Sequence, residues 1–245
     1  MLALIKKEIN GFLNSLIGYV VILVFLLTIS LFLWVFPGGS FNIPESGYAN
    51  IDGLFVITPY VYLFLIPAIT MRLFSEEKKS GTIELLLTRP LTEMQVILAK
   101  YAAGVVLVFI SLLPTVIYYI TIYKVSLPVG NVDSGAIAGS YIGLMLLGAC
   151  FVAIGLLASA VSDNQVVAFI IAFFLCLFFM QGFESIAALA PAGMLNNILF
   201  NVGINAHYLS LSRGVIDTRD VVYFLSLIAI FLFLTRTVLE SRKWR

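Results

Sequence analysis

Charged residues are scarce in this chain of 245 residues: 11% are Asp, Glu, Lys or Arg, whereas 61% are hydrophobic. Soluble proteins carry roughly 25% charged residues, so the composition excludes an ordinary soluble domain. The mean hydropathy is +1.08, and several apolar runs are long enough to cross a bilayer. These features predict an all-α polytopic membrane protein in which residues 1–245 form one transmembrane domain.

Cysteine, histidine and phosphate-binding motifs are also almost missing. Cys150 and Cys176 lie in apolar runs, which indicates free thiols in the bilayer rather than a disulfide framework or a metal site. A single histidine, His207, excludes a histidine-based metal cluster. No G-x-x-x-x-G-K-[ST] loop occurs, so the chain does not bind ATP by that route. We therefore expect no catalytic residue, metal or cofactor in this chain.

Apolar segments of spanning length divide the chain. The predicted spans are residues 16–36, 54–74, 101–123, 135–159, 166–183 and 221–239. Residues 1–15 precede them as an amphipathic segment, predicted to be an interfacial helix with Lys6 and Lys7 toward anionic lipid. Pro59 and Pro67 predict kinks or a broken start in the second span.

Lysine and arginine gather at three places: the first 15 residues, the interval 72–100 and the residues from 236 onward. With six spans, these places share one side of the membrane and hold most of the basic residues. The positive-inside rule then makes both termini and residues 75–100 cytoplasmic. We expect the chain to lie in the inner membrane.

The interval 75–100 carries dense charge between two spans. Ser80-Gly81-Thr82 predicts a turn whose Thr82 caps a short helix, with Glu84 in its first turn and Pro90 at its end. Thr92–Gln95 reads as a capping box that begins the next helix. From the charges alone, the segment could be a solvated loop that obeys the positive-inside rule. The pattern of caps and apolar residues instead favours a docking site for a soluble partner.

Residues 76–90, which read EEKKSGTIELLLTRP, resemble the loop after the second span of ABC-2 type transporter permeases. Lys100 resembles the lysine that opens their third span, and residues 209–224 are similar to the approach to their last span. Taken whole, the chain is most similar to the short permease of the gliding-motility ABC transporter of Bacteroidota.

The resemblance implies that residues 75–100 contain a coupling helix, which seats in a groove of a separate ATPase subunit. That partner chain would bind ATP and Mg. The implied docking residues are Glu76, Glu77, Gly81, Thr82, Glu84, Leu86, Leu87 and Pro90.

Small residues recur in the fourth predicted span. Gly135, Gly139 and Gly143 follow one another at every fourth position, a spacing typical of close helix–helix contacts. Such a row could also be a surface on which helices slide. Close packing is the interpretation we favour.

Residues 184–220 contain two apolar pieces, 186–192 and 194–202, that are too short to span a bilayer. They are predicted to be re-entrant or interfacial helices, which the resembled family has in the outer leaflet. Arg213 and Asp217 lie four residues apart and are expected to pair on one helix face. Glu184 could be a functional acid or a solvated interfacial group. His207 could relay protons or be hydrogen-bonded locally.

We therefore interpret the chain as the permease subunit of an ABC-2 exporter linked to gliding motility. A second permease, in a heterodimer or a homodimer, and ABC ATPase subunits would complete the complex, and no nucleic acid is expected to bind. A membrane anchor of a motility or secretion machine is the rival hypothesis. Stimulation of ATP hydrolysis by a candidate substrate separates the two. A secondary transporter is disfavoured because the spans lack carboxylates.

Overall fold

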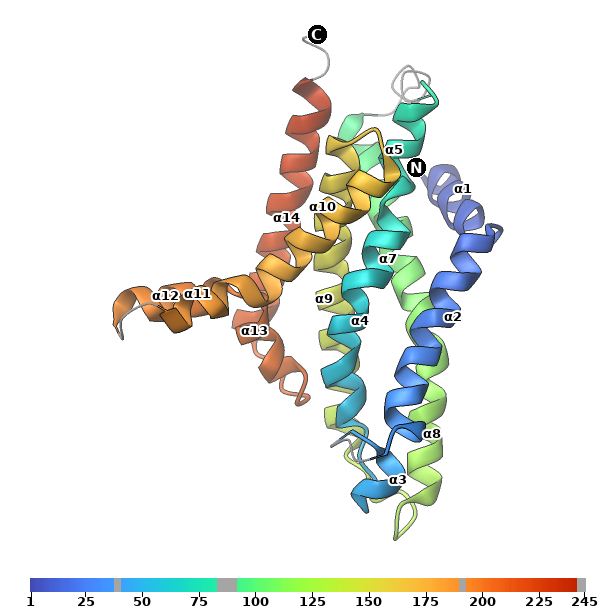
Figure 1. Cartoon of the computed structure of the whole chain (residues 1–245), viewed down its shortest axis with the longest axis vertical. Coiled ribbons are helices and arrows are strands. Elements are labelled where there is room, and N and C mark those ends of the chain that lie inside the picture. Colours follow the sequence, from blue (N-terminus) through green and yellow to red (C-terminus); the bar gives the residue numbers. More distant parts are fainter. Residues whose placement is uncertain (38–40, 83–91, 190–192, 242–245) are drawn as a thin grey trace.

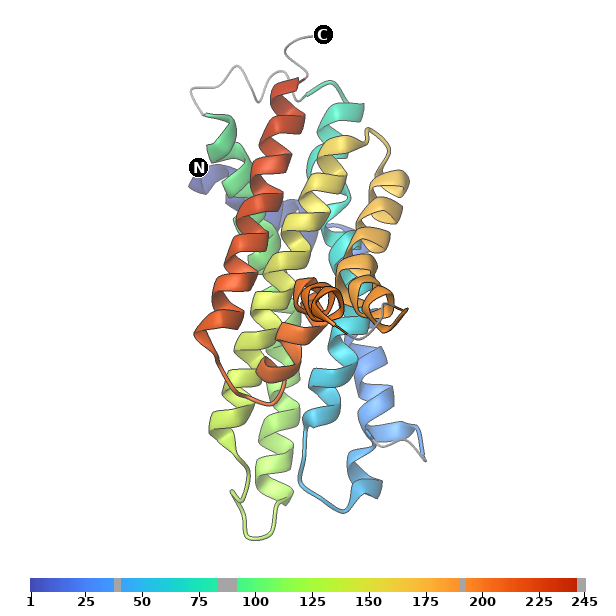
Figure 2. The same cartoon turned by 90° about the vertical axis from the view of Figure 1, so that its left-hand side faces the viewer.

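The computed structural model describes residues 1–37, 41–82, 92–189 and 193–241, without the side chain of residue 195. Within these ranges the chain is almost wholly helical and contains no strand. Figure 1 and Figure 2 show an elongated bundle of long helices, with α11 (Phe183–Leu189) and α12 (Met194–Val202) turned sideways from it. The predicted fold class is thus confirmed at the level of an all-helical chain.

In the part of the chain that the structure describes, six helical stretches are long and apolar enough to cross a membrane, which confirms the predicted number and order of candidate spans. Their bounds are Leu16–Val35, Asp52–Lys79, Glu93–Val125, Ser134–Val161, Gln165–Leu189 and Thr218–Glu240. The second and third run well beyond the predicted 54–74 and 101–123. Hydropathy locates the apolar part of a helix, whereas the helix itself continues through its charged ends.

Most of these stretches are composite. α1 (Leu2–Leu13) precedes the first, which consists of α2 (Leu16–Ser30) and the π-helical η1 (Leu31–Val35). The remaining elements, in chain order, are α3 (Ile43–Ser46), α4 (Asp52–Thr70), α5 (Arg72–Lys79), α7 (Glu93–Leu112), η2 (Leu113–Thr115), α8 (Val116–Val125), α9 (Ser134–Val161), α10 (Gln165–Leu177), η3 (Phe178–Gly182), α11, α12, α13 (Ile204–Leu211) and α14 (Thr218–Glu240).

α9 forms the centre of the bundle and packs against α4, α7, α10 and α14. Its small residues allow this close approach. A Cβ atom on Gly155 would come within 2.1 Å of Thr70 Oγ1, and one on Gly148 within 2.8 Å of Val108 Cγ1. Both free cysteines are buried, as the sequence indicates.

The prolines interrupt the helices less than expected. α4 is a single helix through Pro59 and Pro67, so the broken start predicted for the second span is not found. Each proline removes one backbone hydrogen bond, but both lie in the buried part of the helix, where neighbouring helices hold the backbone in place. The helix is interrupted instead at Met71, between α4 and α5, and the third span changes to a 3₁₀ turn around Pro114.

The two ends of the bundle differ. The start of α1, the end of α5 and the end of α14 lie at one end, whereas α3 and the turn after α8 lie at the other (Figure 1). The corner between α13 and α14 stops short of that second end in both views (Figure 2). The segment between the fifth and sixth spans therefore lies at an intermediate height along the long axis.

Candidate functional site

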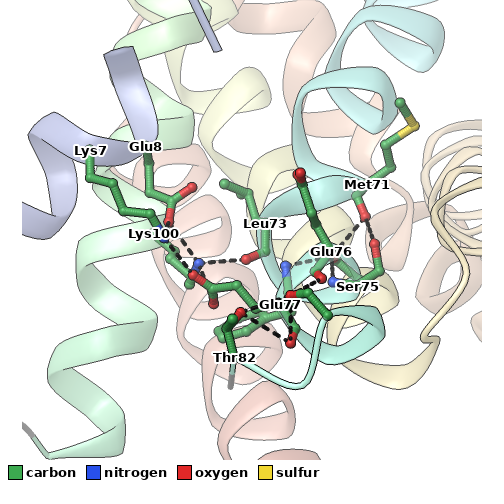
Figure 3. Close-up of polar contacts among 12 residues, drawn as sticks. Lys7, Glu8, Met71, Leu73, Ser75, Glu76, Glu77, Thr82 and Lys100 are labelled. Atoms are coloured by element: carbon green, nitrogen blue, oxygen red, sulfur yellow. Dashed lines mark hydrogen bonds and ion pairs between the residues drawn. The ribbon is translucent and has the colours of Figure 1, made fainter. Parts of the chain in front are cut away.

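Four ionised side chains join the start of the third span to α1 and α5. Lys100 in α7 is fully buried, and its Nζ lies 2.8 Å from Glu8 Oε1 and 2.9 Å from Glu77 Oε2. The same amine donates to the Leu73 carbonyl at 2.5 Å. Lys7 Nζ donates to Glu77 Oε1 at 2.8 Å. We refer to Lys7, Glu8, Glu77 and Lys100 as the ion cluster, which Figure 3 shows converging between the three helices.

Local sequence signals bring Lys100 to this position. The Thr92 hydroxyl accepts from the Gln95 amide at 3.3 Å, and the Gln95 side-chain carbonyl accepts from the Thr92 amide at 3.1 Å. This confirms the predicted capping box. It begins α7 two turns before Lys100, which therefore shares the buried face of the helix with Val96 and Ile97.

Charge balance makes this burial tolerable. Taking a single ion out of water costs several kcal/mol unless it is paired and hydrogen-bonded. The ion cluster contains two cations and two anions, and it opens toward solvent at Lys7, whose side chain is 60% exposed. Burial lowers the pKa of Lys7, but the hydrogen bond and charge of Glu77, together with Glu8, raise it by more. Glu77 thus holds the amine of Lys7 at the rim of the cluster, and the expectation that Lys6 and Lys7 lie toward anionic lipid stays a prediction.

A second contact holds α1 against the bundle. The Arg72 guanidinium lies over the Phe12 ring, 4.8 Å from its centroid, and Nη1 donates to Ser15 Oγ at 3.2 Å. Between α1 and α5 lies a cavity of about 270 Å³ that is lined by members of the ion cluster and by Arg72. α1 is thus fixed to the second and third spans by polar contacts, in addition to the burial of Phe12.

At the interruption between α4 and α5, backbone groups form hydrogen bonds with a side chain of the fourth span. Ser159 Oγ accepts from the backbone amides of Phe74 and Ser75, at 2.9 and 3.1 Å, and donates to the Met71 carbonyl at 3.0 Å. A single α9 hydroxyl therefore satisfies three backbone groups where the helix is interrupted. This fixes the direction in which α5 leaves the bundle.

The predicted docking residues lie in different surroundings. Glu77 points inward into the ion cluster and is only 7% exposed, so its side chain faces Lys100 rather than solvent, and its contact with an ATPase stays a prediction. Glu76 is exposed. Gly81 adopts the left-handed region with φ of 69°, and Thr82 lies in the turn that follows α5. The other predicted residues, Glu84, Leu86, Leu87 and Pro90, lie outside the described residues.

Lys78 is likewise not part of a solvated loop. Its side chain is 1% exposed, its Nζ lies 3.6 Å from Asp163 Oδ1, and it donates to the Ala160 carbonyl. It therefore links α5 to the turn between the fourth and fifth spans.

The glycine row of α9 packs against the corner between α13 and α14. A Cβ on Gly139 would lie 2.4 Å from the Gly214 carbonyl oxygen, and one on Gly143 would lie 2.7 Å from Leu211 Cβ. Gly135 takes no part in this contact, because its Cβ would meet only Asp133 Oδ1, at 3.4 Å. Ser140 on the same helix donates to the Ser212 carbonyl at 2.9 Å.

A second polar group lies where α12, α13 and α14 meet. His207 Nδ1 lies 2.7 Å from Asp220 Oδ1, and its Nε2 lies 2.9 Å from the Asn201 carbonyl oxygen. Ser210 donates to the other oxygen of Asp220, and the Tyr223 ring stacks on the imidazole with centroids 3.8 Å apart. The local hydrogen bonding considered for His207 is therefore present. We call His207, Ser210, Asp220 and Tyr223 the histidine group.

The expected pair of Arg213 and Asp217 on one helix is wrong. α13 ends at Leu211, the chain turns at Gly214 with φ of 81°, and Asp217 caps α14 by accepting from the Arg219 amide at 2.9 Å. Glu184 accepts a hydrogen bond from Asn205 Nδ2 at 2.7 Å, which ties α11 to α13.

Sequence reasoning missed Glu8 and Asp220. Both had a usable signal, because an acidic residue beside an apolar helix face usually has a buried partner. Among the described residues, no group of three His, Cys, Asp or Glu side chains could hold a metal ion.

The family model described as ABC-2 family transporter protein matches residues 2–244. No curated protein matches the chain significantly. Because the match covers nearly the whole chain, the chain belongs to the ABC-2 transporter family. Together with the six apolar stretches, this makes it a multi-pass membrane protein. It is of the transmembrane-subunit type, whose family generally works with ABC ATPase subunits.

Proposed function

We propose that this chain is the permease subunit of an ABC exporter and that ATPase subunits dock on residues 81–90 of the coupling region 75–100. The observation that carries the proposal is the ion cluster together with the family match. Residues 80–92, which include this docking segment, connect α5 to α7, and Lys100 of α7 is paired with Glu77 of α5. A displacement of the docking segment would therefore reach two spans that cannot separate without breaking a buried ion pair.

The same cluster gives α1 a role in coupling. Because Glu8 shares Lys100 with Glu77, α1 would follow the second and third spans when they move. ATP binding and hydrolysis take place on the partner chain. In this chain, the ion cluster would keep α1, α5 and α7 together, and the hydrogen bonds of Ser159 would make α9, the centre of the bundle, move with α5.

We further propose that both termini and residues 75–100 face the cytoplasm from the inner membrane, which the placement of basic residues supports. A second permease would complete the membrane part, because six spans with few polar groups enclose no evident pathway. The segment 184–220 would be re-entrant, since its corner stops short of the far end of the bundle (Figure 1). The similarity to gliding-motility permeases favours a heteromeric complex with that role.

The docking segment can be tested without disturbing the described fold. We expect Glu84→Lys combined with Leu86→Ala and Leu87→Ala to reach the membrane in normal amount but to lose its ATPase. The lysine opposes the positive end of the predicted helix, and each leucine loses roughly 1 kcal/mol or more of burial. The measurement is recovery of the ATPase subunit that co-purifies with the wild-type chain, with native mass spectrometry expected to show two permeases and two ATPase chains.

A matched control changes two exposed aliphatic residues at the opposite end, Leu127→Ala with Val129→Ala, which should leave ATPase recovery unchanged. Full ATPase recovery and full transport activity in the Glu84, Leu86 and Leu87 variant would refute the docking assignment. Purification of an active wild-type chain that never carries an ATPase would refute the proposed function itself.

A further inference from the structure

The imidazole of His207 has acceptors at both of its nitrogens. Nδ1 faces a carboxylate oxygen of Asp220 at 2.7 Å, and Nε2 faces the Asn201 carbonyl at 2.9 Å. A neutral imidazole has one N–H, and an ionised carboxylate or a backbone carbonyl has no proton to give. Both hydrogen bonds therefore form only when the His207–Asp220 pair holds one additional proton, on either side of the 2.7 Å contact.

The surrounding contacts fix both partners. Ser210 donates to the second oxygen of Asp220, which is 8% exposed. Tyr223 stacks on the imidazole and donates its hydroxyl proton to the Val202 carbonyl at 2.5 Å. Since Asn201 and Val202 are the last residues of α12, the bonds from His207 and Tyr223 hold the carboxyl end of that helix against α13 and α14.

The elements packed around this corner carry several other ionisable groups among the described residues. α12 and η3 carry no ionisable side chain, and Glu184 of α11 is bonded to Asn205. On α9, Tyr141 bonds with Thr115, whereas the buried thiol of Cys150 lies close enough to Tyr223 to act on it electrostatically. On α13, Tyr208 donates its hydroxyl proton to the Phe55 carbonyl. Arg213, Asp217 and Arg219 are exposed and form no ion pair among the described residues. Asp220 and Tyr223 are thus the titratable groups that contact His207.

We propose that His207 and Asp220 form a proton-binding site that controls the segment between the fifth and sixth spans. With the additional proton bound, α12 is fastened to α13 and α14. When the proton leaves, the ring keeps one N–H, which stays on Nδ1 because the ionised Asp220 carboxylate is a stronger acceptor than a backbone carbonyl, and the bond from Nε2 to Asn201 is lost. α12 is then held at this point by Tyr223 alone. The site stands at an intermediate height of the bundle, where an ionisable pair at membrane depth usually has a function (Figure 2).

The single histidine makes the test direct. The full chain is prepared in nanodiscs with a tag that lacks histidine and with ¹⁵N-labelled histidine. Spectra are recorded at about pH 5.5 and about pH 8.5, on either side of the range in which histidine usually titrates. We expect both ring nitrogens to be engaged in hydrogen bonds at the lower pH and one of these bonds to be lost at the higher pH.

A nitroxide on Asn197→Cys reports the mobility of α12, because Asn197 is exposed whereas both native cysteines are buried. In the wild-type background, the label should become more mobile at the higher pH. His207→Phe keeps the stack on Tyr223 but removes both hydrogen bonds, so its label should be mobile at both pH values.

Asp220→Asn provides the discriminating control. Its amide can donate to Nδ1 while its oxygen accepts from Ser210, so a neutral ring can donate from Nε2 to Asn201. The label should then stay immobile at both pH values. The proposal is overturned if the mobility of the label in the wild-type background does not change with pH, or if its mobility in Asp220→Asn changes with pH as it does in the wild type. Neither readout requires an ATPase, so the outcome is independent of the proposed function.

Discussion

Lys100→Met is the perturbation that tests the ion cluster most directly. Methionine retains the length of the side chain but leaves Glu8 and Glu77 facing each other with Lys7 as the remaining cation, which is 60% exposed. Removing one member of a buried ion pair usually costs about 3–5 kcal/mol, because the remaining charge stays buried without compensation. The Leu73 carbonyl also loses the amine that lies 2.5 Å away.

The assay is thermal unfolding of the purified chain in detergent, followed by the loss of the monodisperse peak. For a chain of this size, a loss of about 3–5 kcal/mol corresponds to a decrease in Tm of roughly 6–20 °C. The matched control is Lys6→Met, which removes an exposed lysine from the same helix and should change stability by less than about 0.5 kcal/mol. Equal Tm values for the two variants would refute the argument that Lys100 is a buried, paired charge.

The remaining predictions concern topology and helix packing. With both termini cytoplasmic, single cysteines at Ser46, Asn131 and Asn205 should react with an impermeant reagent added to intact cells. Cysteines at Ser80 and Ser241 should not react, and external labelling of Ser80→Cys would show that the chain has the opposite orientation. Gly139→Ala should destabilise the chain by about 1–3 kcal/mol, because its new Cβ meets the Gly214 carbonyl at 2.4 Å. Gly135→Ala, which meets no neighbouring helix, is the control, and equal unfolding temperatures would contradict the packing assignment.

Local signals in the sequence predicted local structure well. Apolar length identified the candidate spans, and the Thr92–Gln95 capping box is present as expected. Helix ends were underestimated where charged residues continue the helix. α5 extends the second span through Lys79 because Leu73, Phe74 and Glu77 are buried against neighbouring elements. Hydropathy cannot register such burial, since the partners of a charge determine whether that charge can enter the bundle.

The candidate site was less predictable because it depends on contacts between distant segments. Lys100 was counted as a basic residue of the cytoplasmic face, and Glu77 as a docking residue. Their pairing with Glu8 requires α1 to fold back on the third span, and no periodic pattern encodes that arrangement. The predicted pairing of Arg213 and Asp217 on one helix was wrong for a different reason. Their spacing suits one helix, but Gly214 takes a positive φ and Asp217 begins a new helix.

The ion cluster is better explained by specificity than by stability. An apolar cluster of similar volume is often as stable as a buried ion pair, so stability alone would not require four charges here. The charges do fix which residues of α1, α5 and α7 lie opposite one another, because any slip leaves a buried ion without a partner. Combining Lys100→Met with Glu8→Gln and Glu77→Gln removes this requirement. That triple variant should regain much of the Tm lost by Lys100→Met, whereas α1 should remain loosely positioned, as a nitroxide at the exposed Leu2 would report. Recovery of Tm together with a fully immobile α1 would show that apolar contacts such as Phe12 position the helix without the ion cluster.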